Sequence, residues 1–223
     1  GPERARDWRQ TRIVSTPDGT TSRALILMDM AHVVWAVNLA CLGFHVWPYL
    51  ADRPDVADEL RLDLDPQPGV DFDDVRAASV EARRLLDELG IVGYPKTTGN
   101  RGLHVYVRLE PRWDSYQVRA AAVAAARELE RRRPELITAA WWKEERGRRV
   151  FIDYNQNARD RTIASAYSVR ARPDATVSAP VTWDELADVE TEDFTLRTMP
   201  KRFAKLGDVQ AEIDDAVCDL RKL

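Results

Sequence analysis

The segment of residues 61–66 constrains the fold most, because charged and apolar side chains alternate along it. It reads Arg-Leu-Asp-Leu-Asp-Pro, and the closing proline cannot donate a hydrogen bond within a sheet. Side chains on a strand alternate between its two faces, so Leu62 and Leu64 face one side. Asp63 and Asp65 both face the other. We therefore expect a sheet with one face in the core and two neighbouring carboxylates on the opposite face.

Strands and helices follow one another irregularly along the rest of the chain. Amphipathic helices are predicted over 71–89, which is stopped by Gly90, and over 115–133, which is stopped by Pro134. Further helices are expected over 29–43, 183–189 and 209–223, and strands over 11–14, 23–27, 45–48, 94–96, 103–107, 150–154 and 165–170. Because no strict strand-helix-strand repeat is present, the pattern predicts an α+β or mixed α/β fold, in a single domain spanning residues 1–223.

Composition and charge exclude several classes of protein. Hydrophobic residues make up 44% and charged residues 31% of the chain, as in folded globular proteins. With a net charge of −4, the chain must contact DNA or RNA through a local patch and not through its whole surface. The longest apolar stretch, 24–47, contains Asp29, His32, Asn38 and His45, which argues against a membrane span. Two cysteines predict neither a disulfide scaffold nor a zinc site and favour a reducing cytoplasm.

Asp153 is a third acid of interest, since it lies within the apolar run 150–154. An unpaired buried charge would cost several kcal/mol, so a cation is expected beside it. Three carboxylates on strands are a recurrent way to hold two divalent cations through oxygen ligands. Ordinary alternatives stay open at this point. Asp65 could cap the turn that follows it, Asp63 could be solvated, and Asp153 could lie on an exposed edge strand.

Residues 96–104 have the chemistry of a loop that binds phosphate. They read Lys-Thr-Thr-Gly-Asn-Arg-Gly-Leu-His and join two predicted strands. The segment is not a Walker A motif, and a surface hairpin would have a similar composition. Downstream of the third acid, Gln156, Arg159, Arg161 and Arg170 offer further donors, and guanidinium groups match triphosphate oxygens. A solvated basic strand is the alternative reading.

A local basic patch is predicted over residues 141–149, which begin with two tryptophans. Its cations could follow a phosphate backbone and are the candidate nucleic-acid contacts Lys143, Arg146, Arg148 and Arg149. An exposed hairpin with its tryptophans in the core would look the same. Among the histidines, His32 is expected to be a structural helix residue, whereas His45 and His104 lie beside strands and could reach phosphates or bases.

Taken in order, these motifs resemble the polymerase domain of bacterial DNA ligase D, of the archaeo-eukaryotic primase superfamily. The segments that carry the resemblance are 44–48, 62–66, 96–105, 151–157, 166–170 and 177–186. The resemblance implies a primase-like core with an RRM-like sheet packed against a second α/β unit. It implies that Mn²⁺ or Mg²⁺ is bound by Asp63, Asp65 and Asp153, and a nucleoside triphosphate by His45, Thr98, Arg101, His104, Gln156 and Arg170. Thr98 stands where the family usually has serine, and 143–149 correspond to a mobile element that helps to place the primer terminus.

The implied activity is that of a metal-dependent primase-polymerase that extends a primer 3′-end, by preference with ribonucleotides, in gap filling and non-homologous end joining. The implied partners are DNA primer-template or DNA ends, nucleoside triphosphates, a Ku-type protein and a DNA ligase, at the bacterial nucleoid. Family members carry a further N-terminal segment that recognises a 5′-phosphate and stacks on the template, and this chain is expected to lack it. Two alternatives are a two-metal nuclease or phosphatase, and a non-catalytic module that binds nucleic acid or a protein partner.

Overall fold

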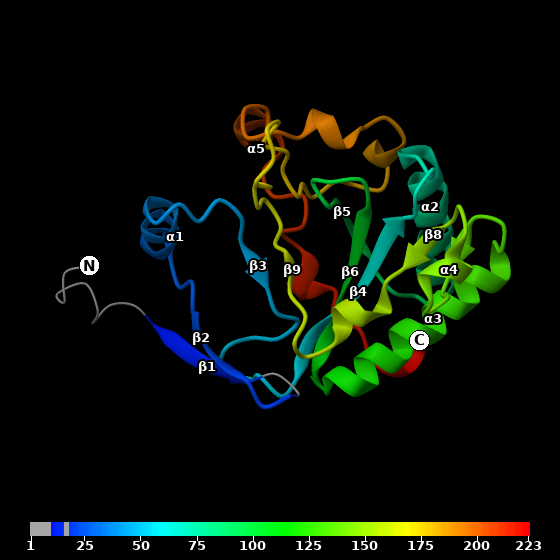
Figure 1. Cartoon of the computed structure of the whole chain (residues 1–223), viewed down its shortest axis with the longest axis horizontal. Coiled ribbons are helices and arrows are strands. Elements are labelled where there is room, and N and C mark those ends of the chain that lie inside the picture. The colour runs from blue at the N-terminus through cyan, green and yellow to red at the C-terminus, as the bar shows by residue number, and fades with distance from the viewer. Residues whose placement is uncertain (1–9, 16–17) are drawn as a thin grey trace.

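The computed structural model describes residues 10–15 and 18–223, and its core is one five-stranded sheet. The long strand β4 lies in the middle (Figure 1), and neighbouring strands are antiparallel except β7 and β8, which are parallel. In sheet order the strands are β5 (Tyr94–Thr97), β6 (Leu103–Trp113), β4 (Ala57–Pro66), β8 (Val150–Ile152) and β7 (Ile137–Thr138). The predicted acidic strand is confirmed, and the fold is mixed α/β as predicted.

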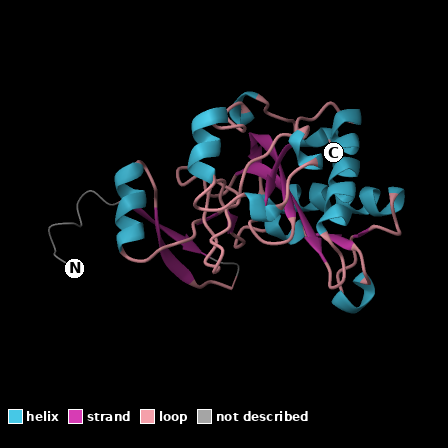
Figure 2. Ribbon diagram, turned by 90° about the horizontal axis from the view of Figure 1, so that it is seen from above, coloured by secondary structure: helices cyan, strands magenta, loops and turns pink. Residues whose placement is uncertain are grey.

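Two long helices cover one face of this sheet (Figures 1 and 2). Helix α2 (Phe72–Glu88) starts with a capping box from Asp71, and helix α3 (Ser115–Arg132) with one from Asp114. The leucines of β4 that face these helices are fully buried, and each contributes about 2 kcal/mol of hydrophobic stabilisation. The alternating acids of β4 consequently lie on the face that the helices leave open.

Shorter elements lie on the other side of the sheet. The hairpin of β1 (Thr11–Ser15) and β2 (Thr21–Leu25) and helix α1 (Met30–Asn38) form one end of the molecule (Figure 2). A small antiparallel sheet of β3 (His45–Val46) and β9 (Ile163–Ala164) lies between that end and the main sheet (Figure 1). The Asp29 side chain accepts a hydrogen bond from the N–H of His32 and so caps the start of α1. The residues Pro17-Asp18-Gly19 between the two predicted strands are typical of a hairpin turn, and Pro17 lies outside the described residues.

The C-terminal third departs most from the sequence predictions. The strand predicted over 165–170 is wrong, because Tyr167 has a left-handed backbone (φ 63°) that no regular strand contains. The helices predicted over 183–189 and 209–223 are also wrong, since these segments form only short 3₁₀ turns. Helix α5 (Met199–Leu206) was not predicted. The short elements of the chain are α4 (Lys143–Arg146) and the 3₁₀ turns η2 (Tyr154–Asn157), η3 (Glu185–Ala187), η4 (Thr191–Asp193), η5 (Ile213–Asp215) and η6 (Leu220–Lys222).

The C-terminal segments are irregular because they bond to the main sheet instead of to themselves. The Cys218 N–H donates to the Arg108 carbonyl of β6 at 2.8 Å, and Val181 N–H donates to the Pro95 carbonyl of β5 at 3.1 Å. Such tertiary contacts override weak local helix propensity. In the described part of the chain, no helix is long and apolar enough to cross a membrane. The single-domain organisation over 1–223 stays a prediction.

Candidate active site

A pocket of about 230 Å³ opens on the sheet face that carries the acids, and segments far apart in the sequence line it. Its walls contain eight of the nine residues predicted to bind metal or nucleotide, namely His45, Asp63, Asp65, Thr98, Arg101, His104, Gln156 and Arg170. The ninth, Asp153, lies beside the pocket, where its Oδ2 accepts a hydrogen bond of 3.1 Å from Gln156 Nε2. The fold therefore brings together the residues that the sequence singled out.

The three acids share one electrostatic environment. Asp153 directly follows β8, and its N–H donates to the Asp63 carbonyl oxygen on β4 at 2.8 Å. Burial raises the pKa of Asp63 well above its ordinary value, and the charges of Asp153 and Asp65 raise it further. Burial and the charge of Asp153 also raise the pKa of Asp65. Because β8 lies between β4 and β7, the alternative that placed Asp153 on an edge strand is wrong.

These acids offer only oxygen ligands, the kind that Mg²⁺ and Mn²⁺ prefer. Within residues 10–15 and 18–223, no three His, Cys, Asp or Glu side chains are arranged to hold a metal ion as they stand. The Asp153 carboxylate is instead turned toward the N–H of Asn155, at 3.0 Å, and toward Gln156. The donor set nevertheless fits a divalent cation, since such an ion would offset the repulsion that raises the pKa of Asp63. Metal binding stays a prediction.

Asp63→Asn is expected to raise the melting temperature of metal-free protein by a few degrees near neutral pH. The folded-state pKa of Asp63 is raised, so the folded protein holds this proton more tightly than the unfolded chain does. That contribution to stability is present below about pH 4 and is lost as the pH rises through the raised pKa. Thermal melts of both proteins across this pH range measure the difference. A variant that melts below the wild type at neutral pH would contradict the expectation.

Lys96 and His104 lie beside Asp63 on neighbouring strands and are buried. Lys96 Nζ is 2.7 Å from His104 Nδ1, and His104 Nε2 is 3.4 Å from Asp63 Oδ1. Burial lowers the pKa of Lys96 to about 7, although the negative charge of Asp63 opposes this shift. Burial also lowers the pKa of His104 well below its ordinary value, and the nearby positive charge of Lys96 adds to the effect. His104 is therefore uncharged near neutral pH.

The loop between β5 and β6 closes one side of the pocket. Thr98 Oγ1 accepts hydrogen bonds from the N–H groups of Asn100 and Gly102, at 3.0 and 3.2 Å. Gly99 has φ +65°, and a Cβ there would lie 2.6 Å from Arg170 Cγ. Only glycine combines a positive φ with the absence of a Cβ. Gly99 therefore allows the loop to pack closely against Arg170. The hydrogen bonds to Thr98 hold the loop in a compact form, and phosphate binding by it stays a prediction.

A second hollow of about 410 Å³ adjoins the pocket and shares His45, Asn100 and Arg170 with it. Arg170 Nη1 is 3.2 Å from His45 Nε2 at this junction. Burial and the charge of Arg170 lower the pKa of His45. Arg172 lines the second hollow and was not singled out from the sequence. The two hollows together offer a ligand more room than the acidic pocket alone.

The predicted basic patch does not line either hollow, and its side chains differ in exposure. Trp141 and Trp142 are 53% and 63% exposed, so the alternative that placed them in the core is wrong. Arg146 is buried, donates to the Ala140 carbonyl at 3.1 Å and lies over the Phe151 ring, 3.5 Å from its centroid. Its guanidinium therefore stabilises the fold of this segment.

The other three cations of the patch lie closer to solvent. Arg149 donates to the Pro134 carbonyl at 3.2 Å and to the Glu145 carbonyl at 2.7 Å. Arg148 donates to the Gly69 carbonyl at 2.8 Å, while Lys143 is exposed on α4. DNA contacts by Lys143, Arg146, Arg148 and Arg149 stay predictions.

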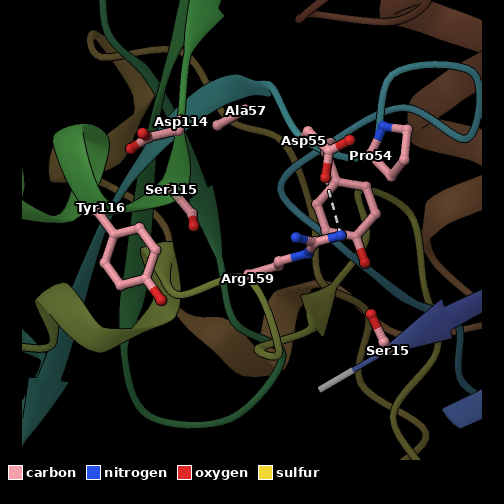
Figure 3. A pocket seen from close by; sticks show the side chains of 9 residues that line it. Ser15, Pro54, Asp55, Ala57, Asp114, Ser115, Tyr116 and Arg159 are labelled. Carbon is pink, nitrogen blue, oxygen red and sulfur yellow. Dashed lines mark ion pairs between the residues drawn. The ribbon is translucent and has the colours of Figure 1, made fainter. Parts of the chain in front are cut away.

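Arg159 belongs to a different hollow, of about 300 Å³, which contains none of the predicted metal or nucleotide residues. Its Nη2 forms an ion pair of 3.0 Å with Asp55 Oδ1, and Tyr116 and Ser115 from the start of α3 lie across the hollow (Figure 3). The guanidinium is thus held away from the acidic pocket. The sequence reading that counted Arg159 among the triphosphate donors is wrong.

Comparison with known proteins identifies the family. Residues 1–210 match the family described as LigD, primase-polymerase domain.

The chain belongs to this family. It is 33% identical, over 94% of its length, to the multifunctional non-homologous end joining protein LigD of Mycolicibacterium smegmatis. It is 34% identical, over 90% of its length, to the bifunctional non-homologous end joining protein LigD of Bacillus subtilis. The chain spans 28% and 33% of these two relatives, respectively.

A solved structure shares the fold. It is the polymerase domain from Mycobacterium tuberculosis Ligase D in complex with DNA, with a TM-score of 0.86 and 30% sequence identity. The similarity covers 96% of this chain and 77% of that one. The predicted family and its primase-like fold are therefore confirmed.

Proposed function

We propose that this chain is the catalytic unit of a metal-dependent primase-polymerase that extends a primer 3′-end during DNA end joining. The observation that carries the proposal is that Asp63 and Asp65 line one pocket together with the residues predicted to bind a nucleotide. Membership of the LigD primase-polymerase domain family supports it. The similar solved domain is in complex with DNA, which supports DNA as the template and primer.

Asp63, Asp65 and Asp153 would hold two divalent ions, Mn²⁺ or Mg²⁺. When bound, such ions lower the pKa of an attacking hydroxyl and neutralise phosphate oxygens. Burial and the charges of the neighbouring acids raise the pKa values of Asp63 and Asp65. This supports the proposal, because a bound cation would stabilise the charged form of both carboxylates.

The remaining pocket residues would bind and orient the incoming nucleoside triphosphate. Arg101 and Arg170 provide guanidinium groups that match phosphate oxygens, and Thr98 fixes the loop that carries Arg101. Gln156 bonds to Asp153, so it can orient that carboxylate while it contacts the nucleotide. His104 is uncharged and can donate a hydrogen bond, and His45 lies at the opening toward the second hollow. Charge that develops on the phosphate during transfer would meet preorganised donors.

Ribonucleotide preference, gap filling and partnership with a Ku-type protein and a DNA ligase form the finer part of this proposal. The names of the relatives, which are multifunctional or bifunctional non-homologous end joining proteins, support the role in end joining. The rest of this finer part is supported only by the resemblance of the sequence motifs to the polymerase domain of ligase D.

A primer-extension assay tests the proposed function. A 5′-labelled primer on a gapped DNA template is incubated with Mn²⁺ and either ribonucleoside or deoxyribonucleoside triphosphates. We expect extension by added nucleotides, faster with ribonucleotides, and none after chelation with EDTA. Primer shortening would favour the two-metal nuclease. Binding of DNA without any change in primer length would favour the non-catalytic module.

A further inference from the structure

The hydrogen bonds around buried Lys96 determine where the protons of its neighbours lie. Lys96 is fully buried, and its Nζ contacts both His104 Nδ1, at 2.7 Å, and Ser178 Oγ. Ser178 Oγ also donates to the Thr97 carbonyl at 3.0 Å. Since the only hydroxyl proton of Ser178 is used in that bond, Ser178 offers Lys96 a lone pair. Lys96 is therefore the donor in its contact with Ser178.

The same reasoning fixes the contact with His104. Below its pKa of about 7, Lys96 is an ammonium with three N–H donors and no lone pair, so His104 Nδ1 has to accept. A histidine ring that accepts at Nδ1 carries its single proton on Nε2. That nitrogen is the one nearer to Asp63, at 3.4 Å, and His104 lines the pocket. The ring consequently points an N–H donor toward the acids and the proposed phosphate site.

The ammonium has few other contacts that could replace its bond to His104. Its Nζ lies 5.3 Å from the centroid of the Tyr106 ring, whose face favours a cation. The neighbouring buried cation, Arg61, directs its Nε to Glu59 at 2.7 Å and its Nη2 to the Val46 carbonyl at 3.1 Å. Among the described residues, Lys96 is thus the group placed to control the His104 ring.

We propose that Lys96 is a positioning residue that selects the His104 tautomer with its proton on Nε2. His104 then serves as a fixed hydrogen-bond donor to phosphate through its Nε2–H, because the lone pair of its Nδ1 is used in the bond to Lys96. A donor that is held in one orientation stabilises developing negative charge without reorganising during the reaction. The benefit for nucleotide transfer rests on the function proposed above, whereas the tautomer itself does not.

Nuclear magnetic resonance of the whole chain, labelled with ¹⁵N at its three histidines, tests the tautomer. Two-bond proton-nitrogen correlations distinguish a protonated ring nitrogen from an unprotonated one. Below the Lys96 pKa of about 7, we expect wild-type His104 to show an unprotonated Nδ1 and a protonated Nε2. The signal is assigned by its loss in His104→Gln. A proton on Nδ1, or on both nitrogens, overturns the proposal without any Lys96 variant.

Lys96→Met keeps the length of the side chain and removes the donor. We expect His104 to become a mixture of tautomers in this variant, and an unchanged Nε2–H pattern would overturn the role of Lys96. Ser178→Ala is the matched control, because it removes the other contact of Lys96 and leaves the bond to His104. Its His104 pattern should stay that of the wild type, and a changed pattern would count against the proposal. If Lys96→Met does not fold, the wild-type and Ser178→Ala spectra still decide.

Primer-extension kinetics distinguish a failure of the Lys96 role from a failure of the proposed function. In primer extension, Lys96→Met should raise KM for the nucleoside triphosphate by about tenfold, with a smaller change in kcat, since one hydrogen bond to a charged group is lost. Unchanged KM in a folded variant whose tautomer is mixed would overturn the link to phosphate binding. A wild-type Nε2–H tautomer in a protein that never extends a primer would contradict the proposed function alone.

Discussion

Replacing Asp63 or Asp65 with alanine is expected to lower the rate of primer extension by about a thousandfold or more, because metal-assisted charge stabilisation contributes several kcal/mol to the barrier. Both carboxylates line the pocket from the same face of β4. The loss should appear in kcat at saturating nucleotide, since the metal ions that the acids would hold act on the reacting groups and not on the nucleobase. Single-nucleotide addition with a labelled primer and Mn²⁺ measures it.

Asp184→Ala is the matched control for these variants. The Asp184 side chain is 93% exposed and does not line the acidic pocket, so its removal should leave extension within about twofold of the wild type. Folding of each variant is checked by its thermal melt. Near wild-type extension by a folded Asp63→Ala protein would remove the basis of the metal-dependent mechanism.

Replacing Arg170 with alanine is expected to reduce kcat/KM for the nucleoside triphosphate by about a hundredfold, since hydrogen bonds to charged groups contribute about 1.5–3 kcal/mol each. Arg170 lies where the acidic pocket joins the second hollow, and its Nη1 is 3.2 Å from His45 Nε2. Most of the effect should appear in KM. Arg170→Lys should recover part of it, because lysine keeps the charge and loses the planar fork.

Arg159→Ala is the matched control for Arg170, since Arg159 is also a downstream arginine but is paired with Asp55 in a separate hollow. We expect it to change kcat/KM by less than about threefold. Steady-state kinetics at fixed primer-template and varied nucleotide measure both variants. Equal losses in Arg159→Ala and Arg170→Ala would indicate that the effect of Arg170 is not specific to the pocket.

The sequence by itself determined the central strand and the identity of the pocket residues. Leucines and aspartates alternate in 61–66, so in a strand they lie on opposite faces, and this local rule holds whatever surrounds the strand. Helices α2 and α3 were predictable for a similar reason, because their apolar periodicity and capping residues act within each helix. The loop over 98–102 that lines the pocket was predicted from its glycines and hydroxyl residues, which the turn itself requires.

Only the tertiary structure decided the surroundings of those residues. Lys96 is fully buried beside His104 because β5 pairs with β6 and because Ser178, from a distant segment, contacts Lys96. Arg159 lies outside the acidic pocket because it pairs with Asp55, a residue about half of the chain away in sequence. The irregular C-terminal segments bond to sheet edges instead of forming helices. Such long-range contacts leave no periodic trace in the local sequence, because each is specified by its partner and not by its neighbours in the chain.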